Sequence, residues 1–408
     1  MSFQMLDNEL DGANIKVVGI GGAGGNAVNH MIDRGVQGVE FIAINTDKQA
    51  LRRSLAAKTI QLGGQGLGAG ARPDAGRAAA DAAREEIRSV LEGANMVFLT
   101  AGMGKGTGTG ASPVVAEVAK ELGILTVGVV TKPFEFEGKK KLQVAEAGIE
   151  QMVELVDSLI VVLNQNLFAV MDEDASLEDA FKRADDVLNN AVAGIAEIIN
   201  VPGLVNVDFA DVQTVMTDKG KAMMGIGSAS GLDRARLAAE QAVASPLLDG
   251  VDLSGARGVI VNITANRSLK LRETNEVINT IKAFCAEDAT IIHGTVFDED
   301  MDDTLRVTVV ATGIGKRAKP VLVQRSGQGV RAPIEPQQAS LPQAEPMPAK
   351  AVAVGGGAAE AVGSQFDRLD EPAIWRSPRG AAANQVKALE DKGVERFDIP
   401  AFLRRQAD

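Results

Sequence analysis

Short apolar runs alternate regularly with helix-like segments through the first 164 residues of the chain. Runs such as NIKVVGI at 14–20 and LTVGVVT at 125–131 are rich in β-branched residues, which is typical of buried strands. Segments of helical length separate these runs. Because parallel strands need long crossover connections, the alternation predicts an α/β fold in which helices cover both faces of a parallel sheet.

The lengths of these segments place the individual elements. Glycines and polar clusters mark strand ends, and proline suits the first turn of a helix. The expected strands are 14–20, 40–45, 96–100, 125–131 and 158–164, and the expected helices run from Asn26 to about Arg34, from Pro73 to about Leu91, from a first turn that contains Pro113, and over 140–156.

A different pattern follows Ser176, which is a suitable N-cap for one long helix over 177–200. Beyond this helix, the expected strands are 212–217, 258–264, 290–297 and 305–312, and the expected helices are 233–244 and 274–285. The last two strands are close enough in sequence to pair antiparallel. These elements predict a second, mixed α+β domain that the long helix joins to the first.

The composition changes after about Lys316: nine of the 14 prolines lie beyond this residue. Pro, Gln, Ala, Gly and Ser dominate 317–395, which predicts a disordered linker. Residues 396–408 then gather Phe, Ile and Leu side chains beside two arginines. This end is either a tail that happens to be apolar or a short motif that folds onto a partner. Residues 1–13 are expected to be flexible.

Charge and composition exclude several classes of protein. With 42 basic and 54 acidic residues the net charge is −12, whereas a dedicated nucleic-acid binder needs a cationic surface. No apolar run reaches the roughly 20 residues needed to span a bilayer, and the N-terminus does not have the pattern of a signal peptide. One cysteine, Cys285, and two histidines argue against disulfides and against a Cys- or His-based metal site. We expect a cytoplasmic protein without direct membrane insertion.

Two glycine-rich loops each join a strand to a helix. The first, at 17–28, matches GxGxxG at Gly19, Gly21 and Gly24, and Glu40 lies roughly where a ribose-binding acid would sit. Taken alone, this loop is compatible with an NAD-dependent enzyme or with a tight turn only. Its physical basis is more general, because glycines let an anion approach the backbone at a helix N-terminus.

The second loop, AGMGKGTGTGAS at 101–112, favours a ligand with several phosphates. Successive backbone N–H groups and the hydroxyls of Thr107 and Thr109 would surround a di- or triphosphate. An NAD site does not need this second cradle, and neither loop fits the Walker A pattern. The loops predict one nucleotide held from two sides, with the glycine-rich loop 63–70 near a γ-phosphate.

The segment NVDFAD at 206–211 places an amide and two carboxylates in one short loop. Asn206, Asp208 and Asp211 can orient and polarise a water for attack on a phosphate. Asp and Asn also favour helix caps and turns, so a purely structural role stays open.

Together these segments resemble the FtsZ family, the bacterial tubulin homologues that are the GTPases of the cell-division ring. The resemblance rests on GGAGGN, GKGTGTG and NVDFAD, and it extends through FEFEGKK, SPLLDGVDLSGARGVIVNIT and the terminal DIPAFLRRQAD. It implies a tubulin-like fold. The domains that it implies are a GTP-binding domain at 14–176, a central helix at 177–200, a C-terminal activation domain at 201–316, the linker at 317–395 and a partner-binding peptide at 396–408.

The resemblance also implies the residues that bind GTP or GDP. The glycine-rich loops would hold the phosphates, and Glu137 would meet the ribose. Guanine would be recognised by the amide of Asn164, the ring of Phe181 and the carboxylate of Asp185. The implied residues are Gly21, Gly22, Ala23, Gly24, Gly25, Asn26, Ala71, Gly104, Lys105, Gly106, Thr107, Gly108, Glu137, Lys141, Asn164, Phe181 and Asp185. Mg²⁺ would neutralise phosphate charge. His30 either flanks the base or is a partly buried spacer.

Two positions depart from the family pattern. Lys105 stands where the family loop GGGTGTG has glycine, and Lys141 stands where the family usually has arginine. A side chain at position 105 could strain the loop, or its ammonium could reach a phosphate. The first possibility gives an alternative hypothesis, namely a GTP-binding filament or regulatory protein with impaired hydrolysis.

The length of helix 177–200 bears on where hydrolysis takes place, because such a helix spans roughly 36 Å. If its start touches the base, as the resemblance implies, the carboxylates beyond its end are too far away to act on the same nucleotide. Asn206, Asp208 and Asp211 would then act on a neighbour's GTP, in a head-to-tail stack that builds filaments. The main hypothesis is a self-assembling GTPase of the division ring at mid-cell, which binds division adaptors and membrane-tether proteins through 396–408.

Overall fold

The computed structural model describes residues 12–171, 174–201, 205, 207–217, 220–248, 255–286 and 288–314. The contacts divide the chain into Met1–Val323 and Gln324–Asp408, and all described residues belong to the first unit. Residues 1–11 of the N-terminus expected to be flexible (1–13), Asn206, the linker and the terminal peptide lie outside the described residues.

The elements of the first half alternate as the sequence predicts. They are β1 (Ile15–Ile20), α1 (Gly21–Asp33), β2 (Val39–Asn45), α2 (Lys48–Arg52), β3 (Lys58–Gln61), α3 (Pro73–Asp81), α4 (Arg84–Leu91), β4 (Met96–Gly102), α5 (Thr107–Glu121), β5 (Leu125–Lys132), η1 (Glu135–Glu137), α6 (Lys139–Leu155), β6 (Ser158–Leu163) and η2 (Asn164–Val170). The long helix and the second half follow as α7 (Leu177–Asn200), α8 (Phe209–Met216), β7 (Gly220–Ser230), α9 (Arg234–Val243), η3 (Pro246–Leu248), β8 (Gly258–Ala265), α10 (Leu271–Lys282), β9 (Thr290–Phe297), η5 (Glu299–Met301) and β10 (Thr304–Ile314).

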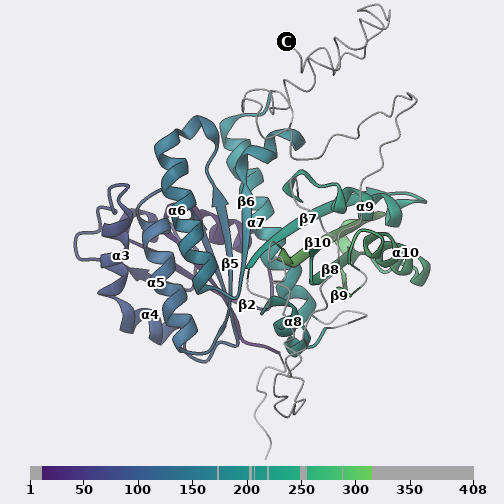
Figure 1. The fold of residues 1–408 in the computed structure, drawn as a ribbon, viewed down its shortest axis with the longest axis horizontal. Helices are drawn as coiled ribbons and strands as arrows, with labels where there is room; N and C mark the ends of the chain where they lie inside the picture. Colours follow the sequence, from purple (N-terminus) through teal and green to yellow (C-terminus); the bar gives the residue numbers. More distant parts are fainter. Residues whose placement is uncertain are drawn as a thin grey trace, which may run out of the picture. The chain divides into compact units, whose positions relative to one another are not determined.

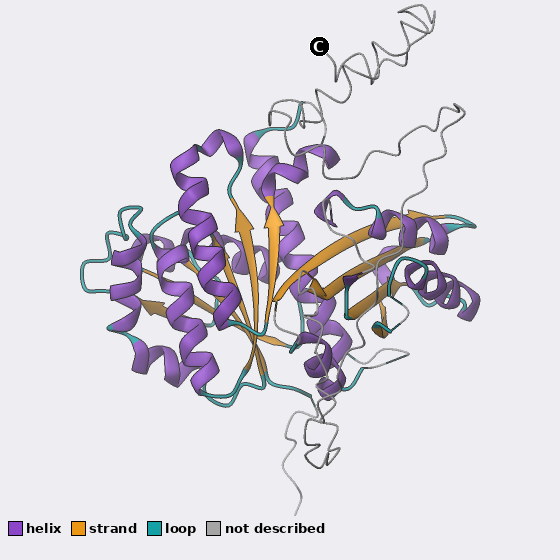
Figure 2. Cartoon of the chain, in the orientation of Figure 1, coloured by secondary structure: helices purple, strands orange, loops and turns teal. Residues whose placement is uncertain are grey.

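The strands form one ten-stranded sheet in the order β3-β2-β1-β4-β5-β6-β7-β10-β8-β9 (Figures 1 and 2). Neighbours from β3 to β6 are parallel, as expected for crossover connections. Strand β10 is antiparallel to both β7 and β8. Strands β6 and β7 pair only from Ser158 to Ile160, and this short ladder joins the parallel part to the mixed part.

Helices cover both sides of the sheet (Figure 1) and bury their apolar faces on it. Buried residues of α1 and α7 form one core with the strands, and those of α3, α4, α5 and α6 form a second core with the strands' other face. Helices α9 and α10 share a third core with β7, β8 and β10. Among the described residues, no helix combines the length and the apolar character that a bilayer crossing requires.

The long helix was predicted with its correct bounds. Ser176 precedes α7, accepts a hydrogen bond at Oγ from the backbone N–H of Asp179 (3.2 Å), and forms a capping box with the Asp179 side chain. A Ser hydroxyl at the N-cap satisfies one of the free N–H groups of the first turn, which explains why the helix begins there.

Three predictions of helices in the first half were wrong in detail. Helix α1 begins at Gly21 and not at Asn26, and α5 begins at Thr107, so that Pro113 lies inside the helix. The glycine-rich loops therefore supply the first turns of both helices. The helix expected from Pro73 to about Leu91 is two helices, α3 and α4, which are separated at Ala82 and Ala83.

The second half contains the larger errors. The strand expected at 212–217 is helix α8, because Val212, Val215 and Met216 are buried at helical spacing. The strands expected at 290–297 and 305–312 exist, but they are not neighbours. Strand β10 inserts between β7 and β8, while β9 lies at the sheet edge parallel to β8. Strands β3 and β7 were not predicted.

Candidate functional site

The two glycine-rich loops meet at the carboxyl ends of adjacent strands. Strands β1 and β4 pair in parallel up to Ile20 and Ala101, and each is followed by a loop or turn that starts a helix. The strand order β3-β2-β1-β4-β5-β6 reverses direction between these two strands. In open α/β sheets ligands bind outside the carboxyl ends of the strands at this reversal.

A cleft of about 480 Å³ lies at this reversal. Most of the nucleotide-binding residues that the sequence implies line it, although they come from six separate segments of the chain. Those that line it are Gly22, Ala23, Asn26, Ala71, Lys105, Gly106, Thr107, Gly108, Glu137, Lys141, Asn164, Phe181 and Asp185.

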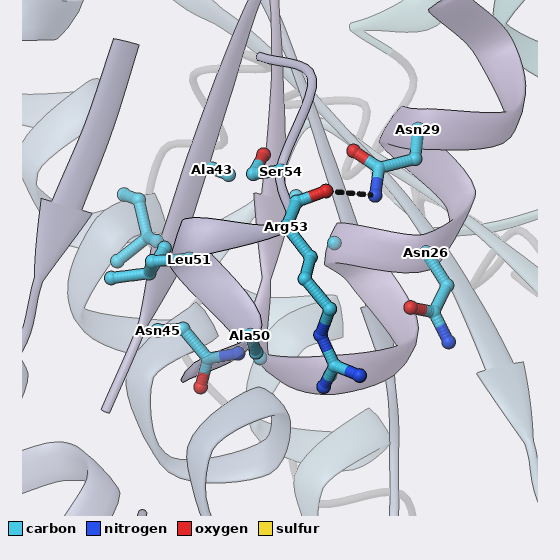
Figure 3. Close-up of a pocket in the computed structure, with 13 residues that line it drawn as sticks. Asn26, Asn29, Ala43, Asn45, Ala50, Leu51, Arg53 and Ser54 are labelled. Atoms are coloured by element: carbon cyan, nitrogen blue, oxygen red, sulfur yellow. Dashed lines mark hydrogen bonds between the residues drawn. The ribbon is translucent and has the colours of Figure 1, made fainter. Parts of the chain in front are cut away.

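A second hollow of about 360 Å³ adjoins the cleft and shares Gly22, Asn26, Asn45 and Ala50 with it. Gly21 and Gly25 line this hollow and not the cleft itself. Figure 3 shows the Asn29 side chain, whose Nδ2 donates to the backbone oxygen of Arg53 at 3.3 Å on the wall of this hollow. The side chain of Arg53 extends into the hollow, between Asn26 and Asn45 in this view.

The glycines of the first loop have different physical roles. A Cβ on Gly24 would overlap the backbone oxygen of Thr100, so that glycine lets α1 pack against β4. A Cβ on Gly22 would meet nothing within 4 Å, and its backbone is not left-handed. Neither packing nor conformation requires glycine at position 22, and the absence of a side chain leaves the backbone there open to the close approach of a ligand.

Both helices that follow the loops present free N–H groups to the cleft. The N-cap residues of α1 and α5 are Ile20 and Gly106, and in the described structure neither has a side chain that caps the helix. The first turn of α1 at Gly22 and that of α5 at Thr107 and Gly108 line the cleft. Uncapped N–H groups and the positive ends of two helix dipoles make this cleft suited to an anion.

The second loop is held in place by its own hydroxyls. The backbone N–H of Gly104 donates to Thr109 Oγ1 at 2.9 Å, and Thr107 Oγ1 lies 2.6 Å from Thr46 Oγ1. Gly104 needs to be glycine, because its φ is 101° and a Cβ would lie 2.7 Å from Lys141. It packs the loop and does not line the cleft.

Lys105 does not strain this loop. Among the described non-glycine residues, only Ala71 and Asp302 have a left-handed backbone, with φ of 57° and 46°. Lys105 therefore adopts an ordinary conformation that any residue tolerates. The hypothesis of impaired hydrolysis loses the backbone strain on which it partly rested.

Three side chains at the other end of the cleft suit a planar, hydrogen-bonding base. Asn164 is buried, and no residue in the described structure bonds to its Oδ1. Phe181 is 41% exposed and packs its edge against the buried Phe134 ring, with centroids 5.6 Å apart. Burial raises the pKa of the Asp185 carboxyl to about 6; the Asp186 charge adds to this rise and His30 opposes it. A buried acceptor that no described residue contacts, such as Asn164 Oδ1 at this cleft, suits a ligand that donates a hydrogen bond.

Glu137 and Lys141 form an ion pair on the wall of the cleft. Glu137 also accepts a hydrogen bond from the backbone N–H of Phe134 at 3.1 Å. The pair fixes the short η1 turn beside the cleft, and both side chains remain in the lining.

His30 pairs with Asp186 and does not line the cleft, since its Nε2 lies 2.8 Å from Asp186 Oδ1. Arg34 donates to the same carboxylate oxygen at 3.0 Å. Of the two interpretations of His30, the structure favours the partly buried spacer.

Asp208 and Asp211 lie at the opposite end of α7 from the base-binding side chains. Asp208 is the N-cap of α8, Asp211 is in its first turn, and both are exposed. The backbone N–H of Val207 bonds to Ile198 O at 3.5 Å, which keeps this segment at the end of α7 (Figure 1). From Asp185 to Ile198 the helix rises about 20 Å, so neither carboxylate reaches the cleft of its own chain.

The sequence interpretation missed one wall of the cleft. Asn45 is the last residue of β2, Thr46 and Asp47 directly follow it, and all three line the cleft. Asn45 and Thr46 are buried, and the Asp47 carboxylate caps α2 by accepting from the backbone N–H of Gln49 at 2.8 Å. The signal was available, because polar residues at the carboxyl end of a strand beside β1 lie at the ligand-binding edge of the sheet.

The fold and the sequence both match known proteins. Residues 14–172 match the Tubulin/FtsZ family, GTPase domain, and residues 220–315 match the FtsZ family, C-terminal domain. The chain is 51% identical to the cell division protein FtsZ of Pseudomonas aeruginosa, with 100% of both chains covered. It is 50% identical to that of Coxiella burnetii, with 99% of both covered.

Solved structures agree with this match. A structure described as an empty FtsZ dimer from M. jannaschii superimposes with a TM-score of 0.71 and 45% identity, over 74% of this chain and 88% of that one. CetZ2 from Haloferax volcanii, at 21% identity and a TM-score of 0.62, shares the fold. The glycine cradle, the sheet order and these matches lead to one conclusion: the chain is a GTPase with a tubulin-like fold and belongs to the FtsZ family of cell-division proteins.

Proposed function

We propose that this GTPase polymerises head to tail into filaments of the bacterial division ring, and that each active site is completed by the next subunit. The observation that carries this proposal is the separation of the cleft from Asp208 and Asp211 along α7. A contact between the cleft of one subunit and the α8 end of another joins two different surfaces. Such heterologous contacts repeat without closing and build filaments.

The cleft residues have distinct roles in this proposal. The first turns of α1 and α5, at Gly22 and at Gly106 to Gly108, hold the phosphates through backbone N–H groups. Glu137 meets the ribose. Asn164 and Asp185 accept from guanine N–H groups, and Phe181 packs against the base. The unpaired Asn164 Oδ1 and the partly buried Asp185 support this assignment.

Hydrolysis is attack of water on the γ-phosphate. Asp208 and Asp211 of the neighbouring subunit, with Asn206, orient that water and polarise it. The uncapped N–H groups of α5 stabilise negative charge that develops on the phosphate oxygens. Mg²⁺, when bound, would neutralise phosphate charge. The cleft has few free carboxylates, since Asp47 caps α2 and Glu137 pairs with Lys141. Phosphate oxygens would therefore supply most of the ligands of Mg²⁺.

The division of the chain into domains is part of the same proposal. Residues 14–176 bind GTP, 177–200 form the central helix, and 201–316 form the activation domain that carries the catalytic carboxylates. Residues 317–395 are a flexible linker, and 396–408 bind division adaptors and membrane-tether proteins at mid-cell. The matches of 14–172 and 220–315 to two separate family domains support the first two boundaries.

A complementation experiment tests the shared site. Asp211→Asn leaves the cleft intact but should weaken activation of the attacking water. Gly22→Val should block nucleotide binding without disturbing the fold, since a Cβ at position 22 meets no protein atom within 4 Å. Each variant alone should hydrolyse GTP at least about tenfold more slowly than the unmodified chain. An equimolar mixture should recover turnover, because an Asp211→Asn cleft can meet the intact carboxylates of a Gly22→Val subunit.

Dependence on protein concentration provides the second measurement. Turnover per subunit should rise above a threshold concentration for the unmodified chain. Turnover that is independent of concentration, together with a mixture no more active than its parts, would remove the shared site from the mechanism. Exposed Asp233→Asn is a matched control that removes the same charge from a different loop.

A further inference from the structure

The cleft carries little positive charge for a ligand with several phosphates. Its ionisable lining residues are Asp47, Lys105, Glu137, Lys141 and Asp185, which are three acids and two bases. An anion that enters such a cleft needs a counter-charge, because moving charge away from water costs free energy.

Most of these charges are already committed within the protein. The Asp47 carboxylate accepts from the backbone N–H groups of Gln49 and Ala50 at the start of α2, at 2.8 and 3.4 Å. Glu137 pairs with Lys141. In the described part of the chain, Lys105 is the one lining cation that has no acidic partner within salt-bridge distance.

The position of Lys105 places this ammonium among the phosphate-binding groups. It directly precedes Gly106, the N-cap of α5, and it is exposed. A Cβ on Gly106 would lie 2.8 Å from Ala69 Cβ and 2.9 Å from Arg72 N, so the loop touches the end of the glycine-rich segment 63–70 here. Lys105 thus lies where the second and third loops meet.

We propose that Lys105 binds the polyphosphate of GTP and acts as a fixed counter-charge that takes over part of the work of Mg²⁺. This inference depends on the proposed placement of the phosphates in the cleft. An ammonium on a flexible stem reaches phosphate oxygens as a point charge, and charge-assisted hydrogen bonds of this kind are about twice as strong as neutral ones. The side chain needs no change of backbone conformation, since its φ is not left-handed.

The experiment uses the full chain and four substitutions. Lys105→Met keeps the length and removes the charge, Lys105→Arg keeps the charge, and Lys105→Gly removes the whole side chain. Lys120→Met is the control, because Lys120 is exposed at the opposite end of α5. Dissociation constants for GTP, GDP and guanosine are measured by calorimetry, in EDTA and in Mg²⁺, at two salt concentrations.

In EDTA, Lys105→Met and Lys105→Gly should weaken GTP binding about ten- to hundredfold and leave guanosine binding unchanged. The loss should be smaller in Mg²⁺ and at high salt. Lys105→Arg should remain within a few-fold of the unmodified chain, and Lys120→Met should match it.

Three results would overturn the proposal: unchanged GTP affinity in Lys105→Met, an equal loss for guanosine, or the same loss with and without Mg²⁺. Failure of the proposed nucleotide site itself is a different result, because then the unmodified chain binds neither GTP nor guanosine.

Discussion

The proposed contact of the Asp185 carboxyl with guanine predicts that GTP binding depends on pH. Burial raises its pKa from an ordinary value of 3.8 to about 6. At pH 7 about nine-tenths of the groups are ionised, whereas at pH 5 only about one-tenth are. If the ionised carboxylate accepts from guanine, GTP affinity should fall about tenfold between pH 7 and pH 5 through this group. With an ordinary pKa the loss would be less than about 10%.

The same shift affects stability in the opposite direction. A carboxyl whose pKa is raised on folding destabilises the empty protein above pH 6, and the penalty is relieved as pH falls from about 6 toward 3.8. The difference of about two units between the two pKa values corresponds to a loss of at most about 3 kcal/mol in the free energy of unfolding. Residual contact of the carboxyl with water lowers this loss to about 1–2 kcal/mol. Asp185→Asn should therefore stabilise the empty protein at pH 7 while it weakens GTP binding.

The assay compares GTP with ITP, which lacks the exocyclic amino group of guanine that would donate to Asp185 in the proposed placement. Both ligands have the same triphosphate, so phosphate protonation cancels when the dissociation constant of ITP is divided by that of GTP. In the unmodified chain this ratio should be above one at pH 7 and should fall toward one at pH 5. In Asp185→Asn it should stay near one at both pH values. A ratio that is constant with pH in the unmodified chain would refute the role of a titrating Asp185.

Two stability predictions follow from the structure. Gly24→Ala should destabilise the fold by about 1–3 kcal/mol in chemical denaturation, because its Cβ overlaps Thr100 O. Gly22→Ala should be neutral or stabilising by up to about 1 kcal/mol and should weaken GTP binding. Equal effects of both changes would contradict the different roles assigned to these glycines. Ser176→Ala should cost about 1 kcal/mol through loss of the α7 capping box, and unchanged stability would mean that the cap is not used in solution.

Much of the first half of the fold was predictable, because its signals are local. Glycines, prolines and the Ser176 cap mark ends of elements within a few residues of themselves, and strands buried on both faces are continuous apolar runs. The errors occurred where local signals conflict. Val212 and Val215 favour a strand by residue type, yet their spacing is helical, and burial of that face on the core decided for α8.

Prediction of the nucleotide site had the same limits. The sequence supplied the two glycine-rich loops, and resemblance to a family supplied Asn164, Phe181 and Asp185. Neither showed that Thr46 contacts Thr107 across the cleft, because these residues meet only when β1 lies between β2 and β4.

The sequence by itself determined the alternation of elements in the first half, the two glycine-rich loops between strand and helix, the bounds of the long helix and the position of the lysine in the second loop. These features depend on residues that are close together in the chain. Only the tertiary structure decided that β10 inserts between β7 and β8, that Gly24 packs while Gly22 faces open space, and that Asp185 is partly buried. Each of these depends on groups far apart in sequence, whose approach is set by packing of the whole sheet and its helices.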